Sequence, residues 1–110
     1  MLEQRIQQHF IDSADLKYQA AQALSHPIAA AVQAVLACVT SGGKVLACGN
    51  GPSAAEAQQF AALCVAGFER DRPELAALAL TTDSTLLTAS ASAPDMSSQQ
   101  FARQVRALGQ

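Results

Sequence analysis

The chain has 110 residues, which is enough for one small domain. Half of its residues are hydrophobic by count, but many of these are Ala, and there is no Trp, one Tyr and four Phe. Such side chains bury little area, so the predicted core is thin and we expect surfaces that pack against partners. The net charge is −2 and no run of basic residues occurs, which argues against direct nucleic-acid binding.

Targeting and membrane signals are not expected from the sequence. The first residues lack the apolar segment of a signal peptide, and no apolar run reaches membrane-spanning length. We therefore expect a cytoplasmic protein with no membrane partner. The three cysteines, Cys38, Cys48 and Cys64, have no spacing typical of a disulfide framework or a zinc site, and are expected to be small buried apolar side chains.

The first part of the chain predicts two helices. Residues 2–24 carry an apolar side chain at every fourth position, a helical stripe made of Leu2, Ile6, Phe10, Ala14 and Tyr18. Pro27 predicts a helix break and a second helix that runs to about Thr40. The long apolar stripe predicts a contact in an oligomer. Neither His9 nor His26 has a partner at metal-ligand spacing, so no metal site is expected.

A short apolar strand at residues 44–48 runs into a glycine turn and then a helix at residues 53–66. The N-terminus of a helix after such a turn favours an anion, because its first N–H groups lack partners and its dipole is positive there. Gly49 and Gly51 can take positive φ and let the backbone approach a ligand, and Ser53 adds a hydroxyl donor, so this stretch is a candidate phosphate site. The pattern also fits an ordinary β-to-α turn that binds nothing. It fits neither a P-loop nor a dinucleotide fingerprint, since no Gly-Lys-Ser/Thr follows and Ala54 stands where a third glycine is needed.

The remaining residues predict one more strand and two short helices. A charged loop at residues 68–73, expected to be solvated, leads to a strand at residues 76–80. Asp83 is the expected N-cap of a helix that ends near Leu87, and residues 89–95 are expected to form a loop. Ser97 and Gln100 have the spacing of a capping box for a last helix with an apolar stripe. Two parallel strands do not make a stable sheet, so we expect a larger α/β sandwich or completion by other chains.

Several motifs together resemble the sugar isomerase (SIS) domain, found in phosphoheptose isomerases and in DiaA, the protein that associates with the replication initiator DnaA. The resemblance begins with residues 42–51, which read GGKVLACGNG, and Ser53 after them. Further matches are Phe60-Ala61-Ala62, Arg72-Pro73, residues 77–80, Thr82-Asp83 and residues 104–109. The last block and the Thr82-Asp83 pair are more similar to DiaA. The chain corresponds to the N-terminal half of such a domain.

The resemblance implies a flavodoxin-like, three-layer αβα sandwich with a parallel sheet, which is incomplete in this chain. It implies that residues 1–110 are the N-terminal portion of a single SIS domain. Residues 1–41 would be a helical oligomerisation region of a homotetramer, and residues 44–110 would begin the α/β sandwich. It also implies that Asn50, Gly51 and Ser53 bind a phosphorylated sugar.

The catalytic positions of the isomerases are not kept in this chain. A His and a Glu that bind zinc or hold the base correspond to Gln59 and Leu63, and an Asn-Asp pair that touches substrate corresponds to Ser92 and Ala93. The second glycine of the isomerase Gly-Gly-Ser corresponds to Pro52. Acid–base catalysis needs a titratable group within reach, so no catalytic residue, metal or cofactor is predicted.

Three functions remain open at the level of sequence. The first is a DiaA-like, non-catalytic phosphosugar-binding homotetramer that acts with DnaA in replication initiation. The second is a sedoheptulose 7-phosphate isomerase whose other catalytic groups lie outside this chain. The third is a degenerate fragment with no function of its own. The departures at Gln59 and Leu63 favour the first.

Overall fold

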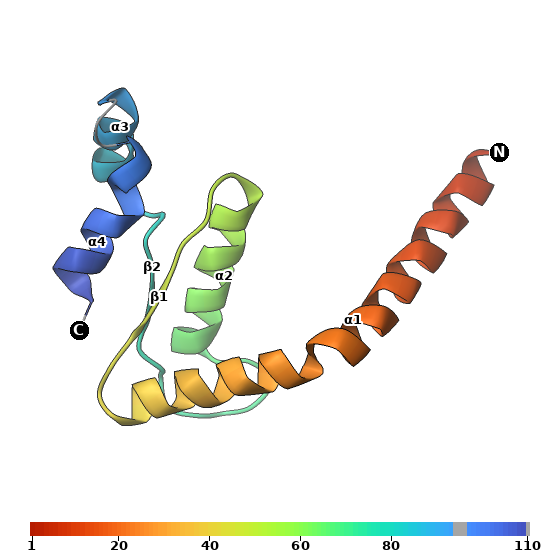
Figure 1. Cartoon of the computed structure of the whole chain (residues 1–110), viewed down its shortest axis with the longest axis horizontal. Coiled ribbons are helices and arrows are strands. Elements are labelled where there is room, and N and C mark those ends of the chain that lie inside the picture. The colour runs from red at the N-terminus through yellow and green to blue at the C-terminus, as the bar shows by residue number, and fades with distance from the viewer. Residues whose placement is uncertain (94–96, 110) are drawn as a thin grey trace. The chain divides into compact units, whose positions relative to one another are not determined.

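The structure is a computed structural model, and it describes residues 1–93 and 97–109. Along the chain the elements are α1 (Leu2–Thr40), β1 (Val45–Ala47), α2 (Pro52–Ala66), β2 (Ala77–Ala79), α3 (Ser84–Ser92), the 3₁₀ turn η1 (Ser97–Gln99) and α4 (Gln100–Leu108). They form two compact units, Met1–Leu36 and Ala37–Gln110. The fold class is α/β with a parallel sheet, as the sequence predicted (Figure 1).

The first unit consists of α1, which is one continuous helix rather than the two predicted from the sequence. Pro27 lies inside it, and α1 bends along its length (Figure 1). A proline inside a helix removes one backbone hydrogen bond and kinks the helix without always ending it. The Ser25 hydroxyl donates to the Ala21 carbonyl one turn back. The predicted break is therefore wrong: the local signal at Pro27 produces a bend.

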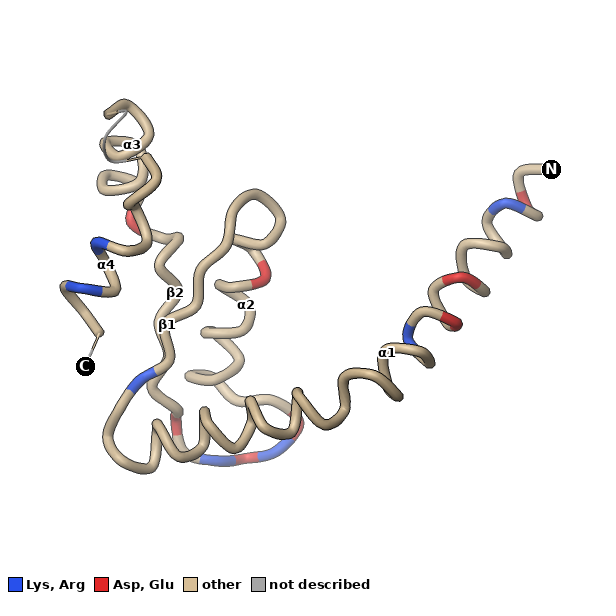
Figure 2. The backbone as a smooth tube through the Cα atoms, in the orientation of Figure 1, with Lys and Arg blue, Asp and Glu red and all other residues tan. Residues whose placement is uncertain are grey.

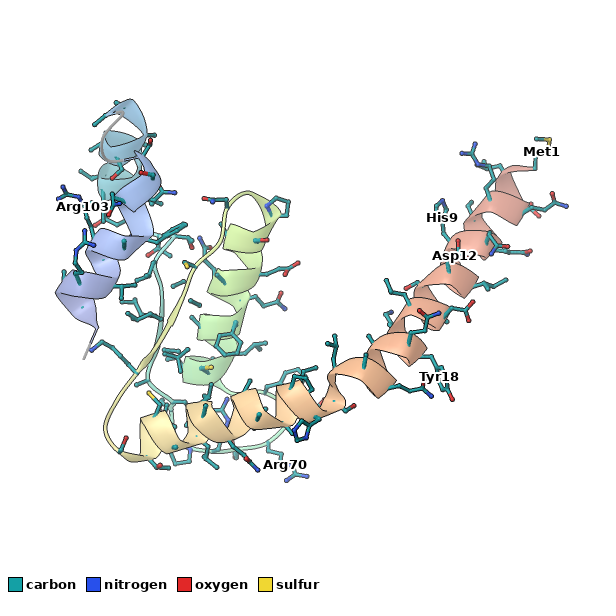
Figure 3. The ribbon with its side chains drawn as sticks, in the orientation of Figure 1. Met1, His9, Asp12, Tyr18, Arg70 and Arg103 are labelled. Atoms are coloured by element: carbon teal, nitrogen blue, oxygen red, sulfur yellow. The ribbon has the colours of Figure 1, made fainter. Side chains whose placement is uncertain are left out.

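Most apolar side chains of α1 are exposed within the described part of the chain, and those of Val35, Cys38 and Val39 near its end are half-buried. Phe10 is 74% exposed, and no α1 side chain is buried there. Charged residues occur only in the first part of the helix, and residues 18–43 contain no Lys, Arg, Asp or Glu (Figure 2). Met1, His9, Asp12 and Tyr18 project outward from α1 (Figure 3). The helix thus presents an uncovered apolar surface.

The hydropathy of α1 corrects one expectation from the sequence. An 18-residue window of this helix has a mean hydropathy of 1.6, so α1 is long and apolar enough, by length and composition, to cross a membrane. The expectation that no apolar run reaches membrane-spanning length was wrong because Gln and His residues interrupt the run, while the many Ala residues keep its mean hydropathy high. Length and composition alone are weak support for a membrane segment, because helices that pack against other protein surfaces give the same average.

The second unit is built on a two-stranded parallel sheet. Val45, Leu46 and Ala47 of β1 pair with Ala77, Leu78 and Ala79 of β2. The Val45 N–H bonds to the Ala76 carbonyl at 2.9 Å, and the Leu80 N–H bonds to the Ala47 carbonyl at 2.8 Å, which extends the ladder at both ends. Parallel strands need a crossover, and α2 supplies it by packing against both strands (Figure 1).

The core of this unit is small, as the composition predicted. Its buried apolar residues are Ala57, Ala61 and Cys64 on α2, together with Ala79 and Leu80 at the end of β2. The α2 residues recur at helical spacing, and their small side chains let the helix lie close to the sheet. Cys64 is buried as expected, but Cys38 is only partly buried and Cys48 is exposed, so the expectation for the cysteines holds fully for one of the three.

The loop between α2 and β2 carries a cluster of charges (Figure 2) and a structural arginine. The Arg72 guanidinium donates to the carbonyls of Leu63 at 2.7 Å and Cys64 at 2.9 Å, and also to that of Pro73 at 3.1 Å. The Leu63 carbonyl also accepts the Gly67 N–H at 2.9 Å, and the Cys64 carbonyl accepts the Leu75 N–H at 3.0 Å. Arg72 therefore adds a second donor to each of these carbonyls at the C-terminal end of α2. The loop is exposed as expected, and Arg72 additionally caps α2.

The helix α3 extends further than predicted. The Asp83 carboxylate accepts the Leu86 N–H at 3.1 Å, so the expected N-cap is confirmed. Residues 89–92 are helical, whereas a loop was predicted over residues 89–95, of which 94–96 lie outside the described residues. The hydroxyls of Thr88 and Ser92 donate to carbonyls one turn back, each at 2.6 Å. Residues 89–92 are thus helical despite the tendency of small polar residues to favour turns.

The predicted capping box is also corrected. Ser97 lies in η1, the N-cap position of α4 is Gln99, and no side-chain bond caps this helix. Instead Gln104, only 7% exposed, donates to the Leu80 carbonyl at 2.9 Å and to the Gln100 carbonyl at 3.2 Å. These bonds anchor α4 to the end of β2 but do not cap it, because a cap would have to accept from the free N–H groups at the start of the helix.

Ser90 of α3 gives a stability prediction. It is fully buried, and its hydroxyl has no hydrogen-bond partner among the described residues. Ser90→Ala should raise the free energy of unfolding by about 1 kcal/mol, because it removes an unsatisfied buried polar group. Urea denaturation followed by circular dichroism measures the change.

The control is Ser92→Ala on the same helix, where the hydroxyl is exposed and bonded to the Thr88 carbonyl. Its effect should stay within about 0.5 kcal/mol. A loss of stability in Ser90→Ala relative to this control would mean that the Ser90 hydroxyl has a partner.

Candidate functional site

The turn after β1 has a defined backbone type. The Ser53 N–H donates to the Asn50 carbonyl at 3.1 Å, so Gly51 and Pro52 are the two central residues of a β-turn. Gly51 has φ 59° and ψ −129°, the values of the first central position of a type II′ turn. That position favours glycine because a side chain at positive φ is strained. Pro52 suits the second position, where its ring holds φ near the negative value required.

Gly49 is required for a different reason, which is space. A Cβ atom added to Gly49 would lie 2.7 Å from the Cβ and from backbone atoms of Ser53. Contacts this short do not occur between such atoms, so the chain can fold back against the first turn of α2 only if residue 49 has no side chain. Gly51 has a positive φ and Gly49 does not, so the two glycines shape the loop by different mechanisms.

The start of α2 offers fewer free amides than the sequence suggested. Pro52 has no N–H, while the N–H groups of Ser53 and Ala54 bond to the carbonyls of Asn50 at 3.1 Å and Gly51 at 3.0 Å. Two of the backbone N–H groups that were expected to be free to bind an anion are therefore already bonded within the turn. The positive end of the helix dipole remains at this point and still favours negative charge nearby.

A cavity of about 220 Å³ opens beside this turn. Its lining is uncharged and comes from four parts of the second unit, namely Gly49, Asn50, Gly51, Ala54, Thr81, Leu87, Gln100 and Phe101. Ligand pockets usually measure at least about 300 Å³, so this cavity is large enough for part of a small ligand. The lining combines amide and hydroxyl groups with the apolar side chains of Leu87 and Phe101, which suits a neutral, hydroxyl-rich ligand surface.

Hydrogen bonds hold the polar lining in place. The Gln100 side-chain Nε2 donates to Asn50 Oδ1 at 3.3 Å, which joins α4 to the turn after β1. Thr81 Oγ1 accepts from Gln58 Nε2 at 3.1 Å and donates to the Ala54 carbonyl at 3.5 Å. Hydrogen bonds therefore join Thr81, after β2, to the first turns of α2, and join α4 to the turn after β1.

The three residues predicted to bind a phosphosugar occupy different environments. Asn50 and Gly51 line the cavity. Ser53 lies in the first turn of α2 with its side chain exposed and is not part of the lining. Glu56, the nearest carboxylate on α2, is likewise exposed and outside the lining.

The positions that correspond to isomerase catalytic residues also lie outside this cavity. Gln59 and Leu63 are one turn apart on α2, and neither lines it. Ser92 and Ala93 lie at the end of α3, where the Ser92 hydroxyl is bonded to the Thr88 carbonyl. Among residues 1–93 and 97–109, no group of three or more His, Cys, Asp or Glu side chains is arranged to hold a metal ion.

Two polar lining residues were not predicted from the sequence. Thr81 follows β2, and the carboxyl ends of parallel strands meet at one edge of a sheet, so its position after a strand was a usable signal. Gln100 carries no such signal, because it lies 50 positions from Asn50 and its neighbours read as a helix start. Only the packing of α4 brings it to the turn.

Substitution of Gly51 tests the turn geometry. Gly51→Ala should lower the free energy of unfolding by about 1–3 kcal/mol, the usual cost of holding a residue other than Gly in a sparsely populated backbone conformation. Pro52→Ala is the matched control within the same turn, and should change stability by about 1 kcal/mol or less. Urea denaturation of both variants provides the comparison. Equal effects of the two substitutions would show that Gly51 does not adopt positive φ.

Comparison with known proteins matches a family model described as the SIS domain over residues 8–110. The chain is 65% identical over 109 residues to a protein of Methylibium petroleiphilum named phosphoheptose isomerase, covering 99% of this chain. It is 53% identical over 105 residues to a protein of the same name from Aromatoleum aromaticum, covering 96% of this chain.

Solved structures give the same result for the fold. A phosphoheptose isomerase from Neisseria gonorrhoeae matches all of this chain with a TM-score of 0.89 and 43% identity, and one from Francisella tularensis matches 99% of it with the same TM-score and 42% identity. The chain covers 56% of both structures and 54% and 52% of the two sequence relatives, so it spans about half their length. The chain belongs to the SIS domain family, as the motifs around residues 42–53 predicted.

Proposed function

We propose that this chain binds a phosphorylated sugar and does not catalyse its isomerisation. The observation that carries the proposal is the cavity beside the turn at residues 49–51, whose lining combines neutral hydrogen-bonding groups with apolar ones. A sugar offers hydroxyls that can both donate and accept, which suits Asn50, Gln100 and Thr81. The start of α2 supplies the partial positive charge that favours the phosphate.

The described lining of the cavity contains no residue that could transfer a proton, which favours binding over catalysis. Isomerisation of an aldose to a ketose needs a group that moves a proton between two carbons, within hydrogen-bond reach of the substrate. Every lining residue named above is non-titratable, and the catalytic positions of the resembled isomerases are filled by Gln59 and Leu63. A protein of the DiaA type would use such a site for binding alone and would act with DnaA in the cytoplasm.

A second candidate is a sedoheptulose 7-phosphate isomerase, which the names of the relatives favour. Because the chain spans about half the length of those relatives, the missing catalytic groups would come from outside it. The two candidates share the phosphosugar site and differ in turnover, so one substrate separates them.

The experiment uses sedoheptulose 7-phosphate with the purified 110-residue chain. Calorimetry measures binding, and a coupled assay with and without Zn²⁺ measures formation of the aldose product. We expect binding without turnover. Turnover at ordinary enzymatic rates, on the order of 1 s⁻¹ or faster, would replace the first candidate by the second.

Ser53→Ala examines the phosphate end of the site. Loss of the Ser53 hydroxyl should weaken binding of sedoheptulose 7-phosphate by about 1 kcal/mol or somewhat more, as for one hydrogen bond to a charged partner. Ser41→Ala, which removes an exposed hydroxyl bonded to the Cys38 carbonyl outside the cavity, serves as the control. Unchanged affinity in Ser53→Ala would place the phosphate elsewhere.

The same proposal includes self-association through α1, as a homotetramer. The apolar stripe of this helix is exposed within the described chain, with Phe10 74% and Leu2 71% exposed. Exposed apolar side chains at helical spacing over this length favour helix-to-helix contact between copies. A tetramer would hold several partner molecules at once and so gain from multivalency.

Phe10→Asp tests this contact. A charge placed in the apolar stripe would be buried without a partner in the assembly, so the variant should dissociate it. Gln19→Asp adds the same charge on the opposite side of α1, where Gln19 is exposed, and should leave the assembly intact. Sedimentation measures the mass of both variants. An unchanged mass for Phe10→Asp would show that this stripe is not the contact.

A further inference from the structure

The amide pair formed by Gln100 and Asn50 limits what the cavity can offer to a ligand. Gln100 Nε2 donates to Asn50 Oδ1 at 3.3 Å, and both residues line the cavity. A carboxamide has one acceptor oxygen and one donor NH₂ group. The bond orients the Asn50 amide with its oxygen toward Gln100, which leaves the Asn50 NH₂ group for a ligand, while Gln100 keeps its side-chain carbonyl oxygen and one N–H.

The position of Gln100 is itself fixed by the protein. Gln100 is the first residue of α4, and its backbone carbonyl, not its side-chain one, accepts from Gln104 Nε2 at 3.2 Å. Gln104 is 7% exposed and donates at the same time to the Leu80 carbonyl at 2.9 Å. The end of β2 therefore anchors α4, and α4 holds an amide against the turn after β1.

Charge on α4 lies away from this arrangement. Arg103 is exposed (Figure 3) and lines a separate cavity with Asp83 and Leu86. Arg106 donates to Gln99 Oε1 at 3.4 Å and does not line the cavity beside the turn. Discrimination inside the cavity thus rests on which amide atoms donate and which accept.

We propose that Gln100 is a positioning and specificity residue of the phosphosugar site, which rests on the function proposed above. It turns the Asn50 amide so that its NH₂ group serves as a donor to ligand oxygen. Its own carbonyl oxygen accepts a hydrogen bond from a sugar hydroxyl. A hydroxyl needs both a donor and an acceptor, whereas a phosphate dianion only accepts, so the pair favours a sugar phosphate over inorganic phosphate.

Three variants separate this role from a structural one. Gln100→Met removes the amide and keeps the length of the side chain. Gln100→Glu keeps acceptor oxygens but cannot donate to Asn50 when ionised. Gln99→Met is the matched control, because Gln99 is the preceding residue, carries the same amide and lies outside the cavity lining.

The first measurement needs no ligand. The side-chain amide protons of Asn50 are followed by NMR, together with amide hydrogen exchange over residues 49–53. Gln100→Met and Gln100→Glu should both shift the Asn50 signal and speed exchange in the turn, while Gln99→Met should leave both unchanged. Wild-type behaviour in Gln100→Met, or rescue by Gln100→Glu, would overturn the positioning role.

The second measurement compares two probes, sedoheptulose 7-phosphate and inorganic phosphate. Gln100→Met should weaken the sugar phosphate about five- to tenfold, the effect of one lost hydrogen bond, and should change the affinity for inorganic phosphate less. Equal weakening of both probes would overturn the specificity role. If the wild-type chain binds neither probe, the proposed phosphosugar function fails, while the ligand-free measurement still decides whether Gln100 orients Asn50.

Discussion

The tight turn between β1 and α2 is the constraint on which the rest of the site depends. Gly51 takes the positive φ of a type II′ turn, and Gly49 leaves room for Ser53 at a distance that no Cβ atom would tolerate. These two backbone conditions bring the end of β1 directly against the start of α2. The cavity, the dipole of α2 and the amide of Asn50 all meet here because the chain reverses within so few residues.

A small core accounts for the exposed surfaces around this site. Ala57, Ala61 and Ala79 let α2 lie close to the two strands, but they bury little area, and larger apolar residues remain exposed, among them Phe60 at 44%. Two parallel strands and one crossover helix are fewer than a stable sheet usually needs. The SIS-family relatives that match this chain are about twice its length. The apolar residues left exposed here are of the kind that further elements of such a domain would cover.

Glutamine side chains make several of the hydrogen bonds that join the elements of the second unit. Gln104 joins α4 to the end of β2, Gln100 joins α4 to Asn50, and Gln58 joins α2 to Thr81. Each glutamine donates to an oxygen of another element, and the bond from Gln104 to the Leu80 carbonyl is buried. A site built this way discriminates ligands by donor and acceptor pattern, and a sugar with a phosphate group fits that pattern through the proposal made above.

Local sequence determined the features that depend on a few consecutive residues. The strand, glycine turn and helix over residues 44–66, the N-cap at Asp83 and the family could all be predicted, because turn chemistry, capping and motif spacing act over short distances. Local signals were wrong at three places: Pro27 bends α1 without ending it, α3 continues to Ser92, and α4 begins after Gln99 without the expected side-chain cap. Tertiary structure alone decided that Gln100 reaches Asn50, since residues 50 positions apart meet only when α4 packs against the end of β2.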